Sequence, residues 1–462
     1  GSEMCIRDRF TMKINHFFLA ITIALAAGAC SDNTFIPAED EETVSISNAQ
    51  SIQRSEDEAM AYAAQFLNIF PHNESRSLPD IKIHALTNKI SRSSSTADTL
   101  LYVAQYGENQ GYAIISGSRE LSPVLAYVEE GNFFDIDNVN NGGFQMYMEA
   151  ASDYVENSIR RASLIEQPIK PAFDDWTIRY NDTIAPRLTV AWSQEYPEGY
   201  FCPNRLSGCA QTALAQILSY YELPAEINLT YPGHPVDKVT LDWSEIKKHS
   251  KSDPIDWKTN QYGIVSHNGS CSASEEAHMA IAYLCRELGH RNNAVYTYKS
   301  ENERSTGASI GDVRNTASAL MEQVGYKFKV AAIADYTKAR FLLDRIKDGI
   351  VYIRGAKQPN MGGHAWVADG GLKVGTVRTH VDYAANPDGS NVVTVTEKLE
   401  MLVHFNWGWG GRSNGYFNPD VFDPREGVSY DTYPSISGEN FKYDVQYLSL
   451  IHISEPTRRV VI

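Results

Sequence analysis

The stretch Gly208–Tyr221, GCAQTALAQILSYY, decides the fold. Its small and apolar residues recur at helical spacing, which predicts a buried helix that ends before Pro224. Cys209 then stands at or just before the first turn, with Ser207 or Gly208 near the cap. The helix dipole and the free N–H groups of that turn favour a thiolate, the nucleophilic form of cysteine. By itself, however, a cysteine at a helix start is more often structural than catalytic.

Two motifs further along the chain carry residues that could act with this thiol. MGGHAWVADG (residues 361–370) places His364 at the start of an alternating, strand-like segment, and the preceding GIVYIRG is expected to pair with it. In VHFNWGWGG (residues 403–411), Asn406 is followed by two tryptophans among glycines. An Asn side chain can accept the second N–H of a histidine and hold the ring in one tautomer. Each motif alone also fits a packed histidine or a tight strand bend.

Taken together and in order, the three motifs resemble the streptopain family of papain-clan cysteine peptidases. The resemblance rests on GCAQTALAQIL, MGGHAWVADG and VHFNWGWGGRSNGYF. Residues 55–160, with their GYAIISG run, are similar to that family's propeptide. The resemblance implies that Cys209 is the nucleophile and His364 the general base and acid. It implies that Asn406 orients His364 and that Trp407 covers this contact.

The resemblance also assigns an oxyanion hole. Gln194, in Ala-Trp-Ser-Gln, matches the oxyanion-hole glutamine and would act with the backbone N–H of Cys209. Fixed donors of this kind are each worth about 3 kcal/mol to the transition state. One departure from the family is Gln211, where a small apolar residue is usual, and we expect it to alter contacts beside the site. Loop Ser305–Ser309 (STGAS) resembles a family segment near the substrate cleft.

The expected fold class is α+β, with a small α+β propeptide domain before a papain-like catalytic domain that has a helical part and an antiparallel sheet part. Ser55-Glu56-Asp57-Glu58 is a capping box that begins a helix. LLYVAQY, GYAIISG and PVLAYVE read as strands, and a helix with Phe144 and Val155 on its apolar face closes this domain. The expected ranges are a propeptide (55–165), an activation linker with three prolines (166–187) and the peptidase domain (188–447).

The two ends of the chain read differently from the rest. Gly1–Arg9 and Leu448–Arg458 resemble translations of a transposon-type sequencing adapter, so residues 1–11 and 448–462 are interpreted as artefacts and the last strand as cut at Tyr447. Residues 12–30 read as a lipoprotein-type signal peptide, followed by a polar tether (31–54). Cys30 would carry the lipid, although an ordinary signal with an incidental cysteine also fits. The protein is therefore expected to be exported, either held at the cell envelope or secreted.

Composition limits the cofactors and partners. The net charge is −16 and no Lys/Arg-rich run occurs, which argues against nucleic acid as a partner. The cysteines outside the adapter and the signal show no metal-ligand spacing, so no metal or cofactor is expected. Cys285 lies in the apolar run AIAYLCREL and is interpreted as a buried thiol rather than as a disulfide partner of Cys271.

These observations predict a hydrolase: a secreted cysteine endopeptidase, made as an inactive zymogen, that forms a thioester at Cys209. Its partners would be protein or peptide substrates and its own propeptide as inhibitor. The family resemblance suggests a hydrophobic substrate residue second from the scissile bond. Two alternatives stay open, a surface lipoprotein that uses a papain-like fold for binding, and a Cys-His acyltransferase.

Overall fold

The computed structural model describes most of the chain from residue 52 to residue 452. The described ranges are 52–69, 80–87, 99–135, 141–164, 172–251, 257–259, 265–267, 272–300, 303–322, 328–330, 334–335, 339–356, 363–382, 392–422 and 444–452. The predictions for the signal peptide, for Cys30, for most of the tether and for Cys271 lie outside the described residues.

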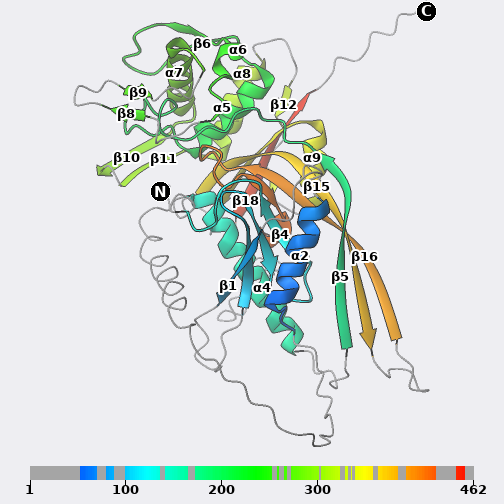
Figure 1. Ribbon diagram of the computed structural model, residues 1–462. Helices are drawn as coiled ribbons and strands as arrows, with labels where there is room; N and C mark the ends of the chain where they lie inside the picture. The colour runs from blue at the N-terminus through cyan, green and yellow to red at the C-terminus, as the bar shows by residue number, and fades with distance from the viewer. Residues whose placement is uncertain are drawn as a thin grey trace, which may run out of the picture.

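The fold is α+β, as expected (Figure 1). The helices are α2 (Glu56–Ile69), α4 (Gly142–Leu164), α5 (Cys209–Tyr221), α6 (Trp243–Ile246), α7 (Glu275–Arg291), α8 (Ile310–Glu322), α9 (Ala339–Asp348) and the 3-10 turn η2 (Pro419–Phe422). The strands of the main sheet are β1 (Ile81–Thr87), β2 (Thr99–Tyr106), β3 (Tyr112–Ser116), β4 (Val124–Val128), β5 (Ala172–Ile184), β12 (Phe328–Val330), β13 (Ala334–Asp335), β14 (Val351–Ala356), β15 (Gly363–Asp382), β16 (Val392–Asn406), β17 (Gly415–Phe417) and β18 (Asp444–His452). Three short hairpins are β6 (Glu226–Asn228) with β7 (Lys238–Thr240), β8 (Trp257–Thr259) with β9 (Val265–His267), and β10 (Val295–Ser300) with β11 (Glu303–Gly307).

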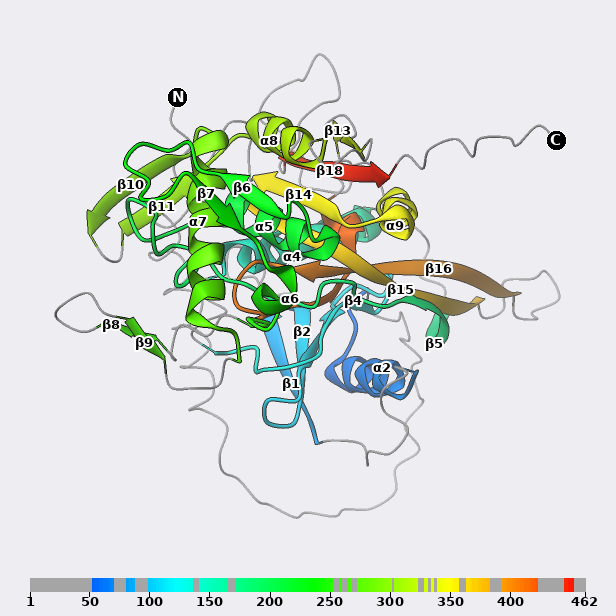
Figure 2. The ribbon, with the colours of Figure 1, turned by 90° about the horizontal axis from the view of Figure 1, so that it is seen from above.

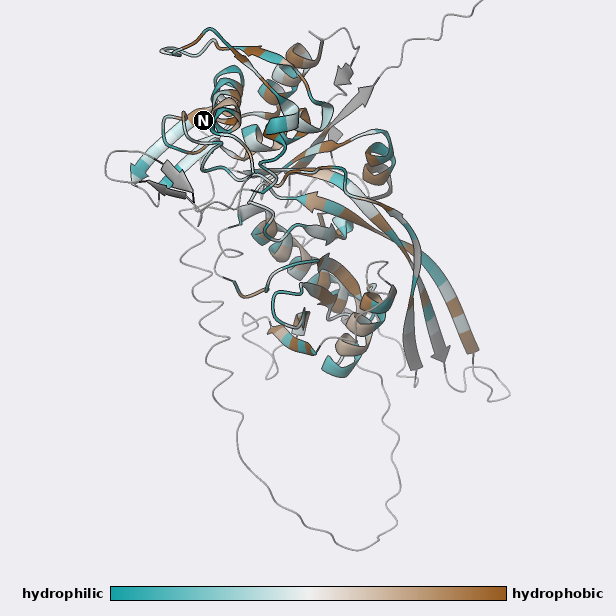
Figure 3. Cartoon of the chain, turned by 45° about the horizontal axis from the view of Figure 1, so that its top comes forward, coloured by the Kyte–Doolittle hydropathy of each residue, from teal (hydrophilic) through white to brown (hydrophobic). Residues whose placement is uncertain are grey.

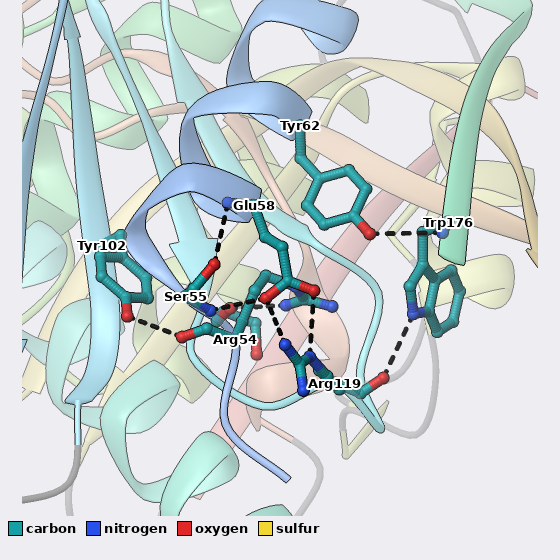
Figure 4. A network of polar contacts seen from close by, with 8 residues as sticks. Arg54, Ser55, Glu58, Tyr62, Tyr102, Arg119 and Trp176 are labelled. Carbon is teal, nitrogen blue, oxygen red and sulfur yellow. Dashed lines mark hydrogen bonds and ion pairs between the residues drawn. The ribbon is translucent and has the colours of Figure 1, made fainter. Parts of the chain in front are cut away.

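The N-terminal unit begins with the predicted capping box. The backbone N–H of Ser55 donates to the Glu58 carboxylate at 2.7 Å, and the N–H of Glu58 donates to Ser55 Oγ at 3.2 Å. Glu58 also pairs with Arg119 at 2.7 Å, which ties α2 to the loop after β3 (Figure 4). The Trp176 indole of β5 donates to the Arg119 carbonyl, and its backbone N–H donates to the Tyr62 hydroxyl. This network fastens α2 to the strand that follows the propeptide.

One antiparallel sheet runs through both parts of the molecule. Its main path is β1-β2-β3-β4-β17-β16-β15-β14-β18-β12. The junction is the pairing of β4 with β17, in which Gly415 lies opposite Val128. A side chain at Gly415 would meet the Tyr127 carbonyl oxygen at 2.3 Å, so glycine permits this close approach. The propeptide strands therefore extend the catalytic sheet instead of forming a separate layer.

The segment predicted as a linker contains a strand. β5 pairs with β15 from Ala172–Asp382 to Ile184–Gly371, and β15, β16 and β5 form a long ribbon that leaves the body of the molecule (Figures 1 and 2). Trp176 and Ile178 alternate toward the core that contains α2. The three prolines that suggested a linker all fall outside the strand, and the apolar alternation between them favours β structure. Toward the ribbon tip, β16 alternates apolar and polar residues, as its colour bands show (Figure 3).

The helical part stands above the sheet, where α5 packs among α7, α8, β14 and β15. The buried faces of these elements share one core, which includes Leu214, Ile281, Val313, Tyr352 and Val367. Because α5 is buried along most of its length, the position of its first residue is fixed by packing on both parts.

The last strand, β18, extends past Tyr447 into residues that the sequence analysis interprets as adapter-derived, and that interpretation stays a prediction. β18 continues to His452 and pairs with β14, with Tyr447 opposite Ile353 and Leu448 opposite Tyr352. The side chain of Leu448 is buried in the core that the helical part shares with the sheet. The edge of β14 is therefore covered.

Candidate active site

Cys209 is the first residue of α5, as predicted, and Gly208 is its N-cap. Gly208 has φ = 90°, a value that only glycine adopts without strain, and a Cβ there would lie 2.8 Å from the Thr306 side chain. The thiol is 7% exposed and sits where the N-terminal N–H groups of α5 favour negative charge. Gln211, which we expected to alter contacts beside the site, is fully buried, and its Oε1 would lie 2.9 Å from a Cβ on Gly208.

His364 lies at the start of β15, opposite Gly355 of β14. Its ring stacks on Trp366 at 6.3 Å between centroids, and its Nε2 lies 2.7 Å from the carbonyl oxygen of Trp407. A carbonyl can only accept, so Nε2 carries the proton and Nδ1 is left as the basic nitrogen. Burial lowers the pKa of His364 to about 4 against a smaller opposing effect of the Trp407 carbonyl, so the ring is neutral near pH 7.

Cys209 and His364 line the same pocket, which is open to solvent. Thr306, Gly307 and Ala308 of the predicted STGAS loop form another wall of this pocket. The helix that carries the thiol and the strand that carries the imidazole come from the two parts of the catalytic domain. The pocket therefore lies where these two parts meet.

Asn406 is buried next to this site but bonds elsewhere. Its Nδ2 donates to the Val190 carbonyl at 3.0 Å, and its Oδ1 accepts the N–H of Gly408 at 3.1 Å. The expected contact between Asn406 and His364 is absent because the Trp407 carbonyl takes the Nε2 proton of His364 in this form. The Asn406–His364 bond stays a prediction for the processed enzyme.

Trp407 is fully buried and packs on Trp366, Phe405 and Phe417. Its indole N–H has no acceptor among the described residues, although a buried N–H of this kind usually has one. The Trp407 backbone N–H is held by the side chain of Asn414 at 3.0 Å. The loop therefore presents the Trp407 carbonyl to His364, and the next tryptophan, Trp409, lies edge-on to the His364 ring at 6.3 Å between centroids.

Gln194 lies on the loop that leads to α5. Its carbonyl oxygen accepts the N–H of Ser207 at 2.8 Å and the Ser207 hydroxyl at 3.2 Å. Thr212 in the first turns of α5 donates to the carbonyl of Ser193, the preceding residue. These bonds fix the Gln194 backbone beside the start of the Cys209 helix, which is where an oxyanion donor is needed.

Sequence reasoning missed one contact at the site and one buried hydrogen-bonded pair further along β15. At the start of α4, a Cβ on Gly143 would lie 2.5 Å from His364 Cδ2 and 2.5 Å from Trp407 Cε3, so the propeptide helix begins directly against both side chains. The second is Asp369, fully buried, which bonds His404 Nδ1 at 2.6 Å and accepts the N–H of Leu188 at 2.9 Å. Neither contact has a local sequence signal.

The other described cysteines differ from Cys209. Cys202 and Cys285 are buried free thiols, which confirms the prediction for Cys285. Burial raises the pKa of Cys202 to about 12 and raises that of Cys285 well above its usual range. Both are protonated and unreactive at neutral pH.

The described ranges contain neither a cluster of metal-ligating side chains nor a helix that could span a membrane. There, His, Cys, Asp and Glu side chains form no group of three that could hold a metal ion. No helix in the same ranges is both long and apolar enough to cross a membrane.

Comparisons with known proteins match both parts of the chain. The model of the Peptidase C10 family matches residues 190–417, and that of the Spi protease inhibitor matches residues 49–155. Streptopain of Streptococcus pyogenes is 25% identical over 397 residues, which cover 81% of this chain and 87% of that protein. The thiol protease/hemagglutinin PrtT of Porphyromonas gingivalis is 24% identical over 358 residues, or 72% of this chain and 35% of that protein.

Among solved structures, a fragment of Prevotella intermedia prointerpain A matches with a TM-score of 0.47 and 20% identity, covering 80% of this chain and 98% of that one. The family matches and the relatives named streptopain and thiol protease/hemagglutinin agree along most of the chain. The chain belongs to the streptopain family and is a cysteine peptidase that carries a Spi-like inhibitor domain ahead of its catalytic domain.

Proposed function

We propose that this protein is a secreted cysteine endopeptidase made as a zymogen, and that it hydrolyses peptide bonds through a thioester at Cys209. The observation that carries the proposal is the shared pocket, which has Cys209 at a helix N-terminus on one wall and His364 at a strand start on another. A thiol and an imidazole in one cleft can exchange a proton to give a thiolate–imidazolium pair.

In the proposed reaction, the Cys209 thiolate attacks the carbonyl carbon of the scissile bond. The developing oxyanion is held by the Gln194 side chain and by the backbone N–H of Cys209. His364 donates its proton to the leaving amine, which departs and leaves a thioester on Cys209. His364 then takes a proton from water, which attacks the thioester and releases the acid product and the thiol.

His364 must first leave the Trp407 carbonyl. Asn406 immediately precedes Trp407, so a short shift of the ring would pass its Nε2 proton from the Trp407 carbonyl to Asn406 Oδ1. In that position Asn406 would hold the tautomer whose Nδ1 faces the thiol, and Trp407 would shield the bond from water.

The proposed inhibitory unit, residues 55–165, acts through α4. Its Gly143 lies against His364 and Trp407, and its β4 pairs with β17 of the catalytic sheet. These contacts favour the neutral ring on the Trp407 carbonyl, which cannot form an ion pair with Cys209. Cleavage within residues 166–187 would release the inhibitor, at a position outside β5 because the β5 backbone is bonded to β15. The catalytic domain would then begin near residue 188.

Export is proposed from residues 12–30, which read as a signal, and Cys30 is the proposed site of a lipid anchor. Relatives named as streptopain and as a thiol protease/hemagglutinin are compatible with a role outside the cell. Protein or peptide substrates and the chain's own propeptide are the proposed partners.

The test compares Cys209→Ala with Cys202→Ala, two single thiol deletions seven residues apart. We expect Cys209→Ala to abolish both self-processing and casein cleavage, and Cys202→Ala to retain both because that thiol is buried and protonated. Full processing of the purified Cys209→Ala chain without added peptidase would refute the assignment.

A further inference from the structure

The ribbon of β5, β15 and β16 has an open edge along its outer strand, β16 (Figure 1). In the described part of the chain, β16 pairs with β17 only at residues 403–405, and residues 392–400 pair with β15 alone. The N–H and C=O groups on the other side of residues 392–400 therefore have no strand to bond among the described residues. We call this segment the β16 edge.

The β16 edge also exposes three apolar side chains on one face of the ribbon. Val393 and Val395 are each 59% exposed, the highest value for a large apolar side chain among the described residues, and Leu399 is 44% exposed. All three have odd numbers and so lie on the same face, because side chains alternate along a strand. Gly375 of β15 lies opposite Leu399 and has no side chain to cover it.

The β16 edge lacks most of the features that keep edge strands apart. Proteins usually protect an edge with proline, with a bulge or with charged side chains. The sequence of residues 392–400, VVTVTEKLE, has no proline, its pairing with β15 has no register shift, and its first five residues carry no charge. An edge of this kind is a template for another strand.

The sequence of the β16 edge is complementary to itself. If two copies pair antiparallel about a two-fold axis at Thr396, residues equally far before and after Thr396 lie opposite each other. Val393 then lies opposite Leu399 of the other copy, and no charged residue of the edge has a charged residue opposite it. A two-fold axis at the next residue, Glu397, would place two carboxylates opposite each other, which is unfavourable.

We propose that two copies of this protein associate by antiparallel pairing of their β16 edges, centred on Thr396. The ribbon leaves the body of the molecule, so this pairing places the two bodies at opposite ends of the joined ribbons (Figures 1 and 2). His364 lies at the other end of β15, so both active-site pockets stay accessible. A single pair of strands buries less surface than a permanent dimer interface does, so we expect a dissociation constant of about 1 to 100 μM.

The experiment measures the mass of the full chain in solution by analytical ultracentrifugation, at protein concentrations from about 1 to about 200 μM. The Cys209→Ala background prevents self-processing during the measurement. We expect a reversible equilibrium between monomer and dimer. Val393→Glu places a carboxylate among apolar side chains twice in each dimer, and should raise the dissociation constant by about 100-fold. Val236→Glu is the matched control, because Val236 is also exposed but lies between β6 and β7, and it should leave the dissociation constant unchanged.

Further variants test the register of the pairing. Leu399→Lys added to Val393→Glu puts an ammonium group opposite each carboxylate, so the double variant should regain most of the lost affinity. In Thr396→Cys the introduced thiol would lie opposite its own copy, with the two Cα atoms about 5 Å apart, and mild oxidation should link two chains. Lys398→Cys is the control for this step, because its thiol would lie opposite Thr394 and should not link two chains.

Three outcomes overturn the inference. A chain that stays monomeric at every concentration contradicts it, even if a different protein occupies the edge. A dimer with an unchanged dissociation constant in Val393→Glu places the contact elsewhere on the molecule. Equal cross-linking of Thr396→Cys and Lys398→Cys shows that the two edges do not pair in the proposed register.

Discussion

Substitution of Gly143 by alanine should weaken the hold of the propeptide on the active site. The new methyl carbon would lie 2.5 Å from His364 Cδ2 and 2.5 Å from Trp407 Cε3, well inside van der Waals contact. Overpacking of this kind costs about 1–3 kcal/mol in a well-packed interior. A difference of about 1.4 kcal/mol is a factor of ten in an equilibrium constant. The open form, in which α4 no longer lies against His364, should therefore become roughly 5- to 150-fold more populated.

The neighbouring residue provides a control at the same helix start. A Cβ on Gly142 would meet nothing within 4 Å, so Gly142→Ala adds the same methyl group and the same helix propensity without the clash. The assay is the initial rate of self-processing, together with the rate at which a thiol reagent labels Cys209 in the unprocessed chain. Both rates should rise in Gly143→Ala only.

A second control separates inhibition by the propeptide helix from the catalytic reaction itself. Position 143 belongs to the segment that processing removes, so the matured Gly143→Ala enzyme should have the same kcat/KM as the unsubstituted enzyme. Equal processing and labelling rates for Gly142→Ala and Gly143→Ala would refute the idea that α4 holds His364 in its inactive position.

Two other predictions concern how the stability of the zymogen depends on pH and how the buried Asp369 contributes to it. The closed form keeps His364 neutral with a pKa of about 4. A solvated imidazole has a pKa of about 6.5. The contribution of neutral His364 to the free energy of unfolding is therefore fully present above that pH and decreases as the pH falls toward 4. The expected decrease is about 2 kcal/mol at pH 5. Urea unfolding of Cys209→Ala at pH 7 and pH 5 measures this, and a His364→Gln background should remove most of the difference. Asp369→Ala removes the oxygen atoms that bond His404 and the Leu188 N–H. It should lower the free energy of unfolding by on the order of 3 kcal/mol, as measured by urea unfolding. An unchanged urea midpoint would contradict this prediction.

The local parts of the site could be predicted from the sequence. The helix after Gly208 follows from the spacing of its apolar residues, and the pairing of the His364 strand with β14 follows from their alternation and proximity in the chain. The capping box at Ser55 formed as its pattern indicated. Each of these depends on interactions within a few residues or between neighbouring strands.

The rest depends on contacts between distant segments. Gly143 and His364 meet only because the propeptide sheet joins the catalytic sheet, and no local pattern indicates this. The Asn406 side chain bonds the Val190 carbonyl and the Gly408 N–H, and His364 bonds the Trp407 carbonyl. The sequence motif around Asn406 indicates neither arrangement. The prolines near β5 suggested a linker. The alternation of Trp176 and Ile178 indicates a strand, but the strand that it pairs with, β15, lies far along the chain.

The most direct test of the central claim is to identify which thiol reacts in the matured protein. The protein is treated with a limiting amount of a thiol-directed peptidase inhibitor near pH 7, and the modified cysteine is located by mass spectrometry. Buried Cys202 and Cys285 have raised pKa values, whereas Cys209 starts a helix beside an imidazole. We predict one label, on Cys209, with loss of peptidase activity in proportion to labelling. Labelling of Cys202 in its place, or full activity after Cys209 is modified, would contradict the account.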